Sequence, residues 1–226
     1  GACHFYGGGG DGVKHGDLDS SLEAPDKALD VHMDAKGLNF SCSTCHKTDG
    51  HQVPGSRYAP TAQDKDGAHM RGKADHSNPA TCQSCHGQVP HKKEAKLNDH
   101  TDKVACQTCH IPSFARGDVP TKMSWDWSTA GKRDEKGKPL VVKNEDGHDI
   151  YLGIKGDFVY GENVKPEYIW FNGKNKYTLS DDKIEKANQP IWINKFEGSA
   201  DDGKSMIWPI KLFRGKQPFD AENKTL

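Results

Sequence analysis

The chain has 226 residues and nearly balanced charge, with 31 Lys and Arg against 32 Asp and Glu and a formal net charge of -1. This balance supplies no basic surface, so we expect no nucleic-acid partner. No apolar run approaches the roughly 20 residues that a membrane helix needs, so we expect no membrane span.

Apolar residues are distributed unevenly. Leu, Ile, Val and Phe number 13 in residues 1–112 and 24 in residues 113–226. A share below roughly 20% rarely builds a core. We therefore expect two regions: a cofactor-nucleated domain over 1–112 that does not fold unaided, and a packed covering region with short strands over 113–226, which holds all five tryptophans.

The chain opens with Cys3 and His4, which match the end of a Cys-X-X-Cys-His motif. The complete motif then occurs three times within 69 residues, at 42–46, 82–86 and 106–110. This is the attachment signature of a c-type haem: two thiols add to the porphyrin vinyl groups while the adjacent imidazole reaches the iron. We predict three haems c and a fourth at Cys3 and His4, which suggests that the chain is part of a longer protein.

Other cysteine chemistries fit less well. Zinc ribbons need two paired Cys-X-X-Cys units per metal and no histidine after each second cysteine. The spacings of ferredoxin iron–sulfur sites are absent, and a disulfide framework favours an even count with longer loops. Covalent haem attachment implies export, so we expect a periplasmic or extracellular protein.

Short elements are predicted along the rest of the chain. Residues 5–12 form a glycine-rich loop whose glycines let the backbone pass close to a haem face. Residues 24–36 are expected to be helical, and 90–100 a short helix with proline at its start. Six strand-like runs follow, at 139–143, 150–160, 168–172, 176–180, 191–196 and 206–213. Asn172-Gly173 is a hairpin-type turn signal.

Histidines exceed the number needed as proximal ligands. His46, His86 and His110 belong to complete motifs and His4 to the partial one, which leaves eight others. A partial repeat places His51 and His91 five residues after a motif histidine, and His100 six residues before a motif cysteine. Eight further histidines are enough to give every haem iron a second histidine ligand. Such bis-histidine ligation favours electron transfer over substrate binding. A solvated surface role remains the alternative for each.

Longer stretches resemble a known family. Residues 1–17, 29–34 (LDVHMD), 37–42 (GLNFSC), 100–112 (HTDKVACQTCHIP) and 214–218 (RGKQP) are similar to the octahaem tetrathionate reductase family of c-type cytochromes. The resemblance implies a periplasmic oxidoreductase acting on tetrathionate, with nitrite and hydroxylamine as further substrates. It also implies His15, His32, His51, His91 and His100 as distal ligands.

In that family the catalytic haem, which has a lysine ligand, lies in the amino-terminal part. This chain is expected to match an internal segment, haems four to seven, so catalytic residues are not carried over and enzyme activity of the segment itself stays open.

The resulting expectation is a multihaem cytochrome c, mostly irregular with short helices around haems in the first half and a β-hairpin-rich, haem-free second half. It would relay electrons through serial haems bound by Cys3, Cys42, Cys45, Cys82, Cys85, Cys106 and Cys109. Its partners would be redox proteins and the haems of the same polypeptide or neighbouring subunits, with a homo-oligomer possible. A non-catalytic conduit or filament is the alternative, and a haem-based sensor a third.

Overall fold

The computed structural model describes residues 5, 10–13, 19–45, 69–70, 73–74, 82–185 and 188–226. Its first half contains short elements: η1 (Ser20–Leu22), α2 (Cys42–Cys45), a two-stranded ladder of β1 (His69–Met70) and β2 (Lys73–Ala74), α3 (Cys82–His86), η2 (Ala95–His100) and α4 (Cys106–His110). Among the described residues, no helix is long and apolar enough to cross a membrane.

The helix expected over 24–36 is absent, and a series of turns takes its place. Three aspartates four residues apart cause this. Asp26 accepts hydrogen bonds from the N–H groups of residues 28 and 29, Asp30 from those of His32 and Met33, and Asp34 from that of Lys36. A short carboxylate that binds the backbone two residues on competes with helix formation.

The helix expected over 90–100 is shorter than predicted and is a 3-10 helix. It begins at Ala95, so Pro90 precedes it instead of starting it. Asn98 within this helix accepts a hydrogen bond from the His91 N–H and donates one to the His91 carbonyl, both at 3.0 Å. The segment around His91 is therefore an extended arm clamped by the helix.

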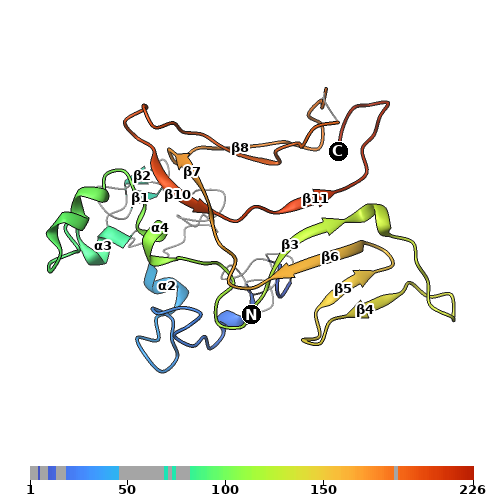
Figure 1. Cartoon of the computed structure of the whole chain (residues 1–226), viewed down its shortest axis with the longest axis horizontal. Helices are drawn as coiled ribbons and strands as arrows, with labels where there is room; N and C mark the ends of the chain where they lie inside the picture. The colour runs from blue at the N-terminus through green and yellow to red at the C-terminus, as the bar shows by residue number, and fades with distance from the viewer. Residues whose placement is uncertain are drawn as a thin grey trace.

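The second half is built from strands (Figure 1). A five-stranded sheet has the order β11 (Arg214–Lys216), β3 (Thr121–Asp126), β6 (Gly156–Gly161), β5 (Asp149–Leu152) and β4 (Val141–Lys143). β11 is parallel to β3, and the other neighbours are antiparallel. Two separate ladders pair β7 (Glu167–Phe171) with β10 (Met206–Ile210) and β8 (Asn175–Tyr177) with β9 (Asn194–Phe196).

The strand predictions were right in kind but missed several details. The run 150–160 is a hairpin of β5 and β6, because a turn at 153–155 interrupts it. The strands β3 and β11 were not predicted. The Asn172-Gly173 turn was expected to close a hairpin, but β7 and β8 on its two sides pair with different strands.

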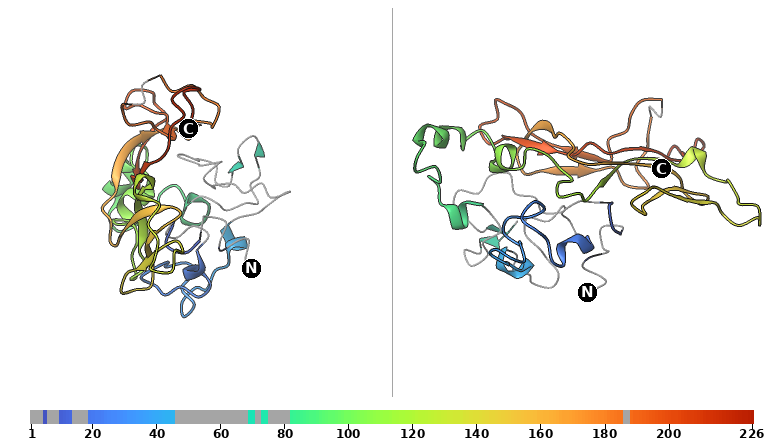
Figure 2. Two further views of the ribbon diagram at one scale, coloured as in Figure 1. Left: turned by 90° about the vertical axis from the view of Figure 1, so that its right-hand side faces the viewer. Right: turned by 60° about the horizontal axis from the view of Figure 1, so that its bottom comes forward.

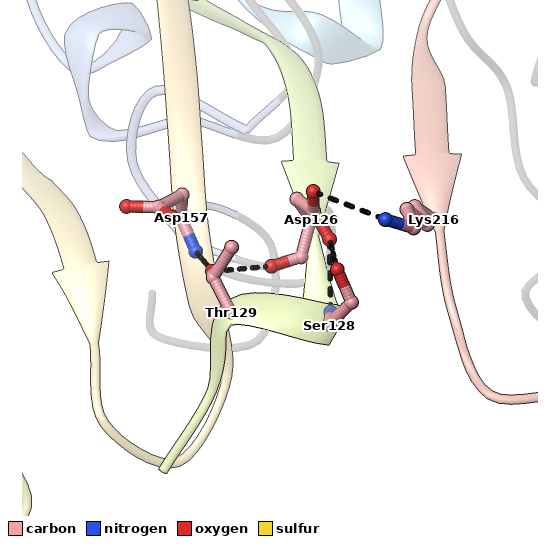
Figure 3. Close-up of polar contacts among 5 residues, drawn as sticks. All are labelled: Asp126, Ser128, Thr129, Asp157 and Lys216. Atoms are coloured by element: carbon pink, nitrogen blue, oxygen red, sulfur yellow. Dashed lines mark hydrogen bonds and ion pairs between the residues drawn. The ribbon is translucent and has the colours of Figure 1, made fainter. Parts of the chain in front are cut away.

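A polar junction joins the sheet's parallel and antiparallel parts at the end of β3 (Figure 3). η3 (Trp127–Thr129) follows β3 directly, and Asp126 caps it by accepting hydrogen bonds from Ser128 N and Oγ at 2.8 and 2.5 Å. These bonds hold the pKa of Asp126 below its usual range. Thr129 Oγ1 accepts from Asp157 N at 2.9 Å, and Lys216 of β11 lies 3.9 Å from the Asp126 carboxylate.

The buried apolar side chains lie mostly in the second half. Among the described residues they are Ala105, Ala115, Tyr151, Phe158, Phe171, Ile184 and Met206. Only Ala105 precedes residue 113. Figure 2 shows residues 19–45, in blue, to one side of the strands and outside the sheet. The described first half thus contributes almost no side-chain core, as its composition predicts.

Gly12, at the end of the glycine-rich loop, contacts the sheet. Gly12 has a φ of +72°, and a Cβ there would lie 3.2 Å from the Tyr160 ring and 3.5 Å from His148 Nδ1. Its N–H donates to the buried Asp19 carboxylate at 2.7 Å, and its carbonyl accepts from Lys122 N at 2.7 Å. Gly12 therefore lets the backbone pass close to two protein rings, where a haem face was expected.

Candidate haem sites

Each complete Cys-X-X-Cys-His motif begins a short helix. α3 and α4 each span a whole motif, and α2 covers the two cysteines of the first. Residues four apart lie on the same face of a helix. One helical turn therefore presents Cys82 on the same side as His86, and Cys106 on the same side as His110. A single porphyrin needs this arrangement, because the cysteine would bind its edge and the histidine its iron.

The third motif is fixed to the sheet through Ile207 of β10. Ala105 N and Thr108 Oγ1 both donate hydrogen bonds to the Ile207 carbonyl, at 3.0 and 2.8 Å. Ile207 N in turn donates to the Lys103 carbonyl at 2.7 Å. These bonds, three in all, hold the start of α4 on an edge of the β7–β10 ladder, so the sheet positions this motif.

The second and third motifs meet through their first cysteines. A hydrogen bond from the Cys82 thiol lowers the pKa of Cys106 to about 6, and the same bond, with burial, raises the pKa of Cys82 far above its usual range. Burial and then the nearby Cys85 raise the pKa of Cys45. Cys82 therefore lies close to Cys106, and Cys45 of the first motif lies near Cys85 of the second.

Two non-motif histidines face motif histidines. The rings of His32 and His86 are 6.2 Å apart between centroids and inclined at 63°, and those of His91 and His110 are 6.0 Å apart and nearly parallel at 11°. Two metal–imidazole bonds of about 2 Å, plus about 1 Å from each nitrogen to its ring centre, give roughly 6 Å. Both pairs therefore fit the two sides of one iron.

Local structure holds both distal rings. The Asp30 turn fixes the His32 backbone, and the His32 carbonyl accepts from Phe40 N at 2.9 Å while the two rings stack at 6.3 Å. His91 is fixed by the Asn98 clamp. Its Nδ1 is buried and lacks a hydrogen-bond partner. An imidazole held so close to a motif histidine is a suitable metal donor.

Both histidines face a motif other than the nearest one in sequence. His32 precedes the first motif by ten residues but faces the second, and His91 follows the second but faces the third. The sequence repeat did not show that these histidines face motifs more distant in the sequence. Sequence reasoning also missed Asp30, Asn98 and Thr108, although an aspartate two residues before a histidine was a readable turn signal.

The remaining predicted ligands are placed less fully. His100 ends η2 and is exposed, and its ring contacts no described motif histidine. Five predicted ligands lie outside the described residues: Cys3, His4, His15, His46 and His51. All of these stay predictions.

Among the described residues, Cys42, Cys45, Cys82, Cys85, Cys106 and Cys109 form no disulfide. Within the same part of the chain, no group of three or more His, Cys, Asp and Glu side chains is arranged to hold a metal ion.

Two comparisons with known proteins agree with this geometry. A family model described as "Cytochrome c bacterial" matches residues 122–226. The crystal structure of an octahaem cytochrome c from Shewanella oneidensis is similar over the whole chain, with a TM-score of 0.77 and 40% sequence identity. The chain covers 46% of that protein's length. No curated protein sequence matches.

The motif helices, the paired imidazoles and these similarities define a multihaem c-type cytochrome, a class that carries covalently bound haem. The chain belongs to a multihaem c-type cytochrome family, to which the Shewanella oneidensis octahaem cytochrome c is similar.

Proposed function

We propose that this chain is the electron-relay segment of a periplasmic multihaem reductase that acts on tetrathionate or on nitrite and hydroxylamine. The observation that carries the relay role is the spacing of two histidine pairs, 6.2 Å for His32 and His86 and 6.0 Å for His91 and His110. The substrate class rests on the sequence resemblance, and the compartment on the usual periplasmic location of bacterial c-type cytochromes.

Haem c supplies a one-electron couple whose potential depends on the axial ligands. The role of the chain is to fill both axial positions with imidazole and to hold the rings rigidly. An iron closed in this way has no position for substrate, so the segment passes electrons and substrate reduction takes place elsewhere. Bis-histidine ligation also lowers the potential relative to His/Met sites.

The closeness of cysteines from different motifs supports serial transfer. Because Cys82 contacts Cys106, the porphyrin edges attached to the second and third motifs would lie side by side. Cys45 near Cys85 brings the first motif close to the second in the same way. Short distances between porphyrin edges favour electron exchange between neighbouring haems.

Every predicted ligand has a role in this proposal. The cysteines, Cys3 among them, form thioethers, and the motif histidines are proximal. His32 and His91 close the second and third haems, and His15, His51 and His100 serve the others. The region 1–112 is the haem domain, and 113–226 is a haem-free scaffold that holds α4 through β10 and offers surface to redox partners or to a second copy.

Intact mass and haem quantitation on one holoprotein sample test the haem content, and three or four covalent haems are expected. Electron paramagnetic resonance then tests ligation. Replacing His32 or His91 with alanine should convert one haem each from low-spin to high-spin. The matched control, Glu94→Ala, changes an exposed side chain without a capping bond and should leave the spectrum unchanged. A sample without covalent haem contradicts the proposal.

A non-catalytic conduit is the second candidate, because both described histidine pairs would close their irons to substrate. Adding cyanide or nitrite to the complete protein, of which this chain is a segment, distinguishes the two. An iron outside this segment that exchanges its ligand supports the reductase, whereas wholly low-spin haems that do not respond support a conduit.

A further inference from the structure

A hollow of about 740 Å³ lies away from the motif helices, between the glycine-rich loop and one face of the five-stranded sheet. β3, β5 and β6, which carry most of its lining, lie side by side (Figure 1). The side chains that matter here are Lys122, Trp125, His148, Lys155, Phe158 and Tyr160. Its volume is within the range of small-molecule sites.

Aromatic rings form the floor of the hollow. Trp125 and Phe158 have ring centroids 5.4 Å apart, and His148 stacks on Tyr160 at 5.2 Å and 27°. The Gly12 backbone lies against the Tyr160 and His148 rings, and a Cβ there would be in tight contact with the Tyr160 ring at 3.2 Å. Flat ring surfaces of this kind bind other flat rings by offset stacking.

Two lysine ammonium groups lie over these aromatic rings. Lys122 Nζ lies 3.8 Å from the Phe158 ring centroid and 5.5 Å from that of Tyr160, and Lys155 Nζ lies 6.0 Å from the Trp125 ring. Burial, and then the charge of Lys155, lower the pKa of Lys122. The two ammonium groups therefore repel each other across the hollow.

Neither Lys122 nor Lys155 forms an ion pair in the described part of the chain, although Asp11 and Asp149 also line the hollow and the charge of Asp149 partly offsets the lowered pKa of Lys122. Lys143, which also lines the hollow, pairs with Asp149 at 2.7 Å and is compensated. A half-buried lysine that repels a second lysine over an aromatic floor leaves a positive potential that an anion would neutralise.

We propose that this hollow binds a planar aromatic anion, with its rings on Phe158 and Tyr160 and its anionic group between Lys122 and Lys155. A small inorganic anion would use the lysines but not the rings, and an uncharged ring would leave both cations unneutralised. Two kinds of molecule have this combination of aromatic ring and anionic group. One is a free aromatic carboxylate, and the other is the propionate edge of one of the protein's own porphyrins. The free-ligand source is independent of the proposed electron relay, because it concerns residues outside the motifs, whereas the porphyrin source rests on the proposed haems.

Equilibrium dialysis of the holoprotein against naphthalene-2,6-dicarboxylate tests the free-ligand source. Saturable binding is expected, with much weaker binding of adipate, which lacks the ring, and of naphthalene-2,6-dimethanol, which lacks the charge. Lys122→Gln should weaken binding roughly tenfold, the usual scale for one charge-assisted contact. Tyr160→Leu should weaken it less. Lys138→Gln, on an exposed lysine outside the hollow, is the matched control and should bind as the parent does.

A redox titration of the same variants tests the porphyrin source. If a propionate edge fills the hollow, the holoprotein does not bind the probe, and Lys122→Gln lowers the midpoint potential of one haem because a positive charge beside it is lost. Lys138→Gln should leave all potentials unchanged. Absence of saturable probe binding together with unaltered potentials in Lys122→Gln overturns the proposal. Thermal melting of each variant confirms that it is folded.

Discussion

The rings of His91 and His110 are nearly parallel, with planes 11° apart and centroids separated by 6.0 Å, although His91 lies outside the helices and His110 ends α4. Two structural devices produce this geometry. Asn98 clamps the backbone of His91 from η2, and the β7–β10 ladder fixes α4, which carries His110. The alignment of this ligand pair therefore depends on residues that touch no haem iron themselves.

The Asn98 clamp can be tested directly. Asn98→Ala removes both hydrogen bonds to the His91 backbone, so the distal ring loses its fixed position. We expect a high-spin component from one haem and faster binding of cyanide at that iron, measured by paramagnetic resonance and by optical mixing experiments. Asn98→Asp keeps the acceptor for the His91 N–H and should give a smaller change. An unchanged spin state in Asn98→Ala would show that His91 is held by other contacts.

The anchoring of α4 on β10 depends on the Thr108 hydroxyl. Thr108→Val keeps the shape of the side chain but loses the 2.8 Å bond to the Ile207 carbonyl. We expect a loss of about 1 kcal/mol in the free energy of unfolding. Denaturant titration of the holoprotein measures this loss, and Thr108→Ser, which retains the hydroxyl, should lie close to the parent. Equal stability of the valine and serine variants contradicts the prediction.

Gly156 is required at the start of β6. It has a φ of +88°, and a Cβ there would lie 2.0 Å from the Asp126 carbonyl oxygen, at the junction of β3 and η3. Gly156→Ala should therefore destabilise the protein by roughly 3 kcal/mol or more, since backbone strain and a backbone clash add. Gly137→Ala is the matched control, because Gly137 has a similar φ of +77° but open space around it. That variant should lose roughly 1 kcal/mol in thermal unfolding measurements.

Asp202 gives the stability a defined dependence on pH. Its carboxylate accepts hydrogen bonds from the Ser205 hydroxyl and from the N–H groups of Lys204 and Ser205, which hold its pKa well below the usual 3.8. A depressed carboxyl pKa stabilises the fold above pH 3.8, and this contribution is lost as the pH falls through the folded-state value.

We therefore expect the melting temperature to fall as the pH drops below about 4. Asp202→Asn should flatten that decline between about pH 4 and pH 2, because the amide does not titrate there. Asp201→Asn changes a neighbouring carboxylate that makes none of these bonds, and it should follow the parent profile. Identical profiles for Asp202→Asn and the parent would show that this turn does not contribute to acid stability.

The sequence by itself determined which residues are candidates for covalent haem attachment. Attachment through Cys-X-X-Cys-His depends on neighbours along the chain, so Cys82, Cys85 and His86 could be predicted without a fold. Composition also determined where side chains pack, because Leu, Ile, Val and Phe are scarce before residue 113. Most strands after residue 139 followed from runs of β-branched and aromatic residues.

Only the tertiary structure decided which histidine faces which motif. His32 and His91 face the second and third motifs because the Asp30 turn, the Asn98 clamp and the Ile207 contacts set their positions. Packing between distant parts of the chain leaves no periodic pattern in the local sequence. The strand β11, the parallel partner of β3, was unpredictable for the same reason. The hollow beneath Gly12 likewise gathers residues more than a hundred positions apart, which only the folded chain brings together.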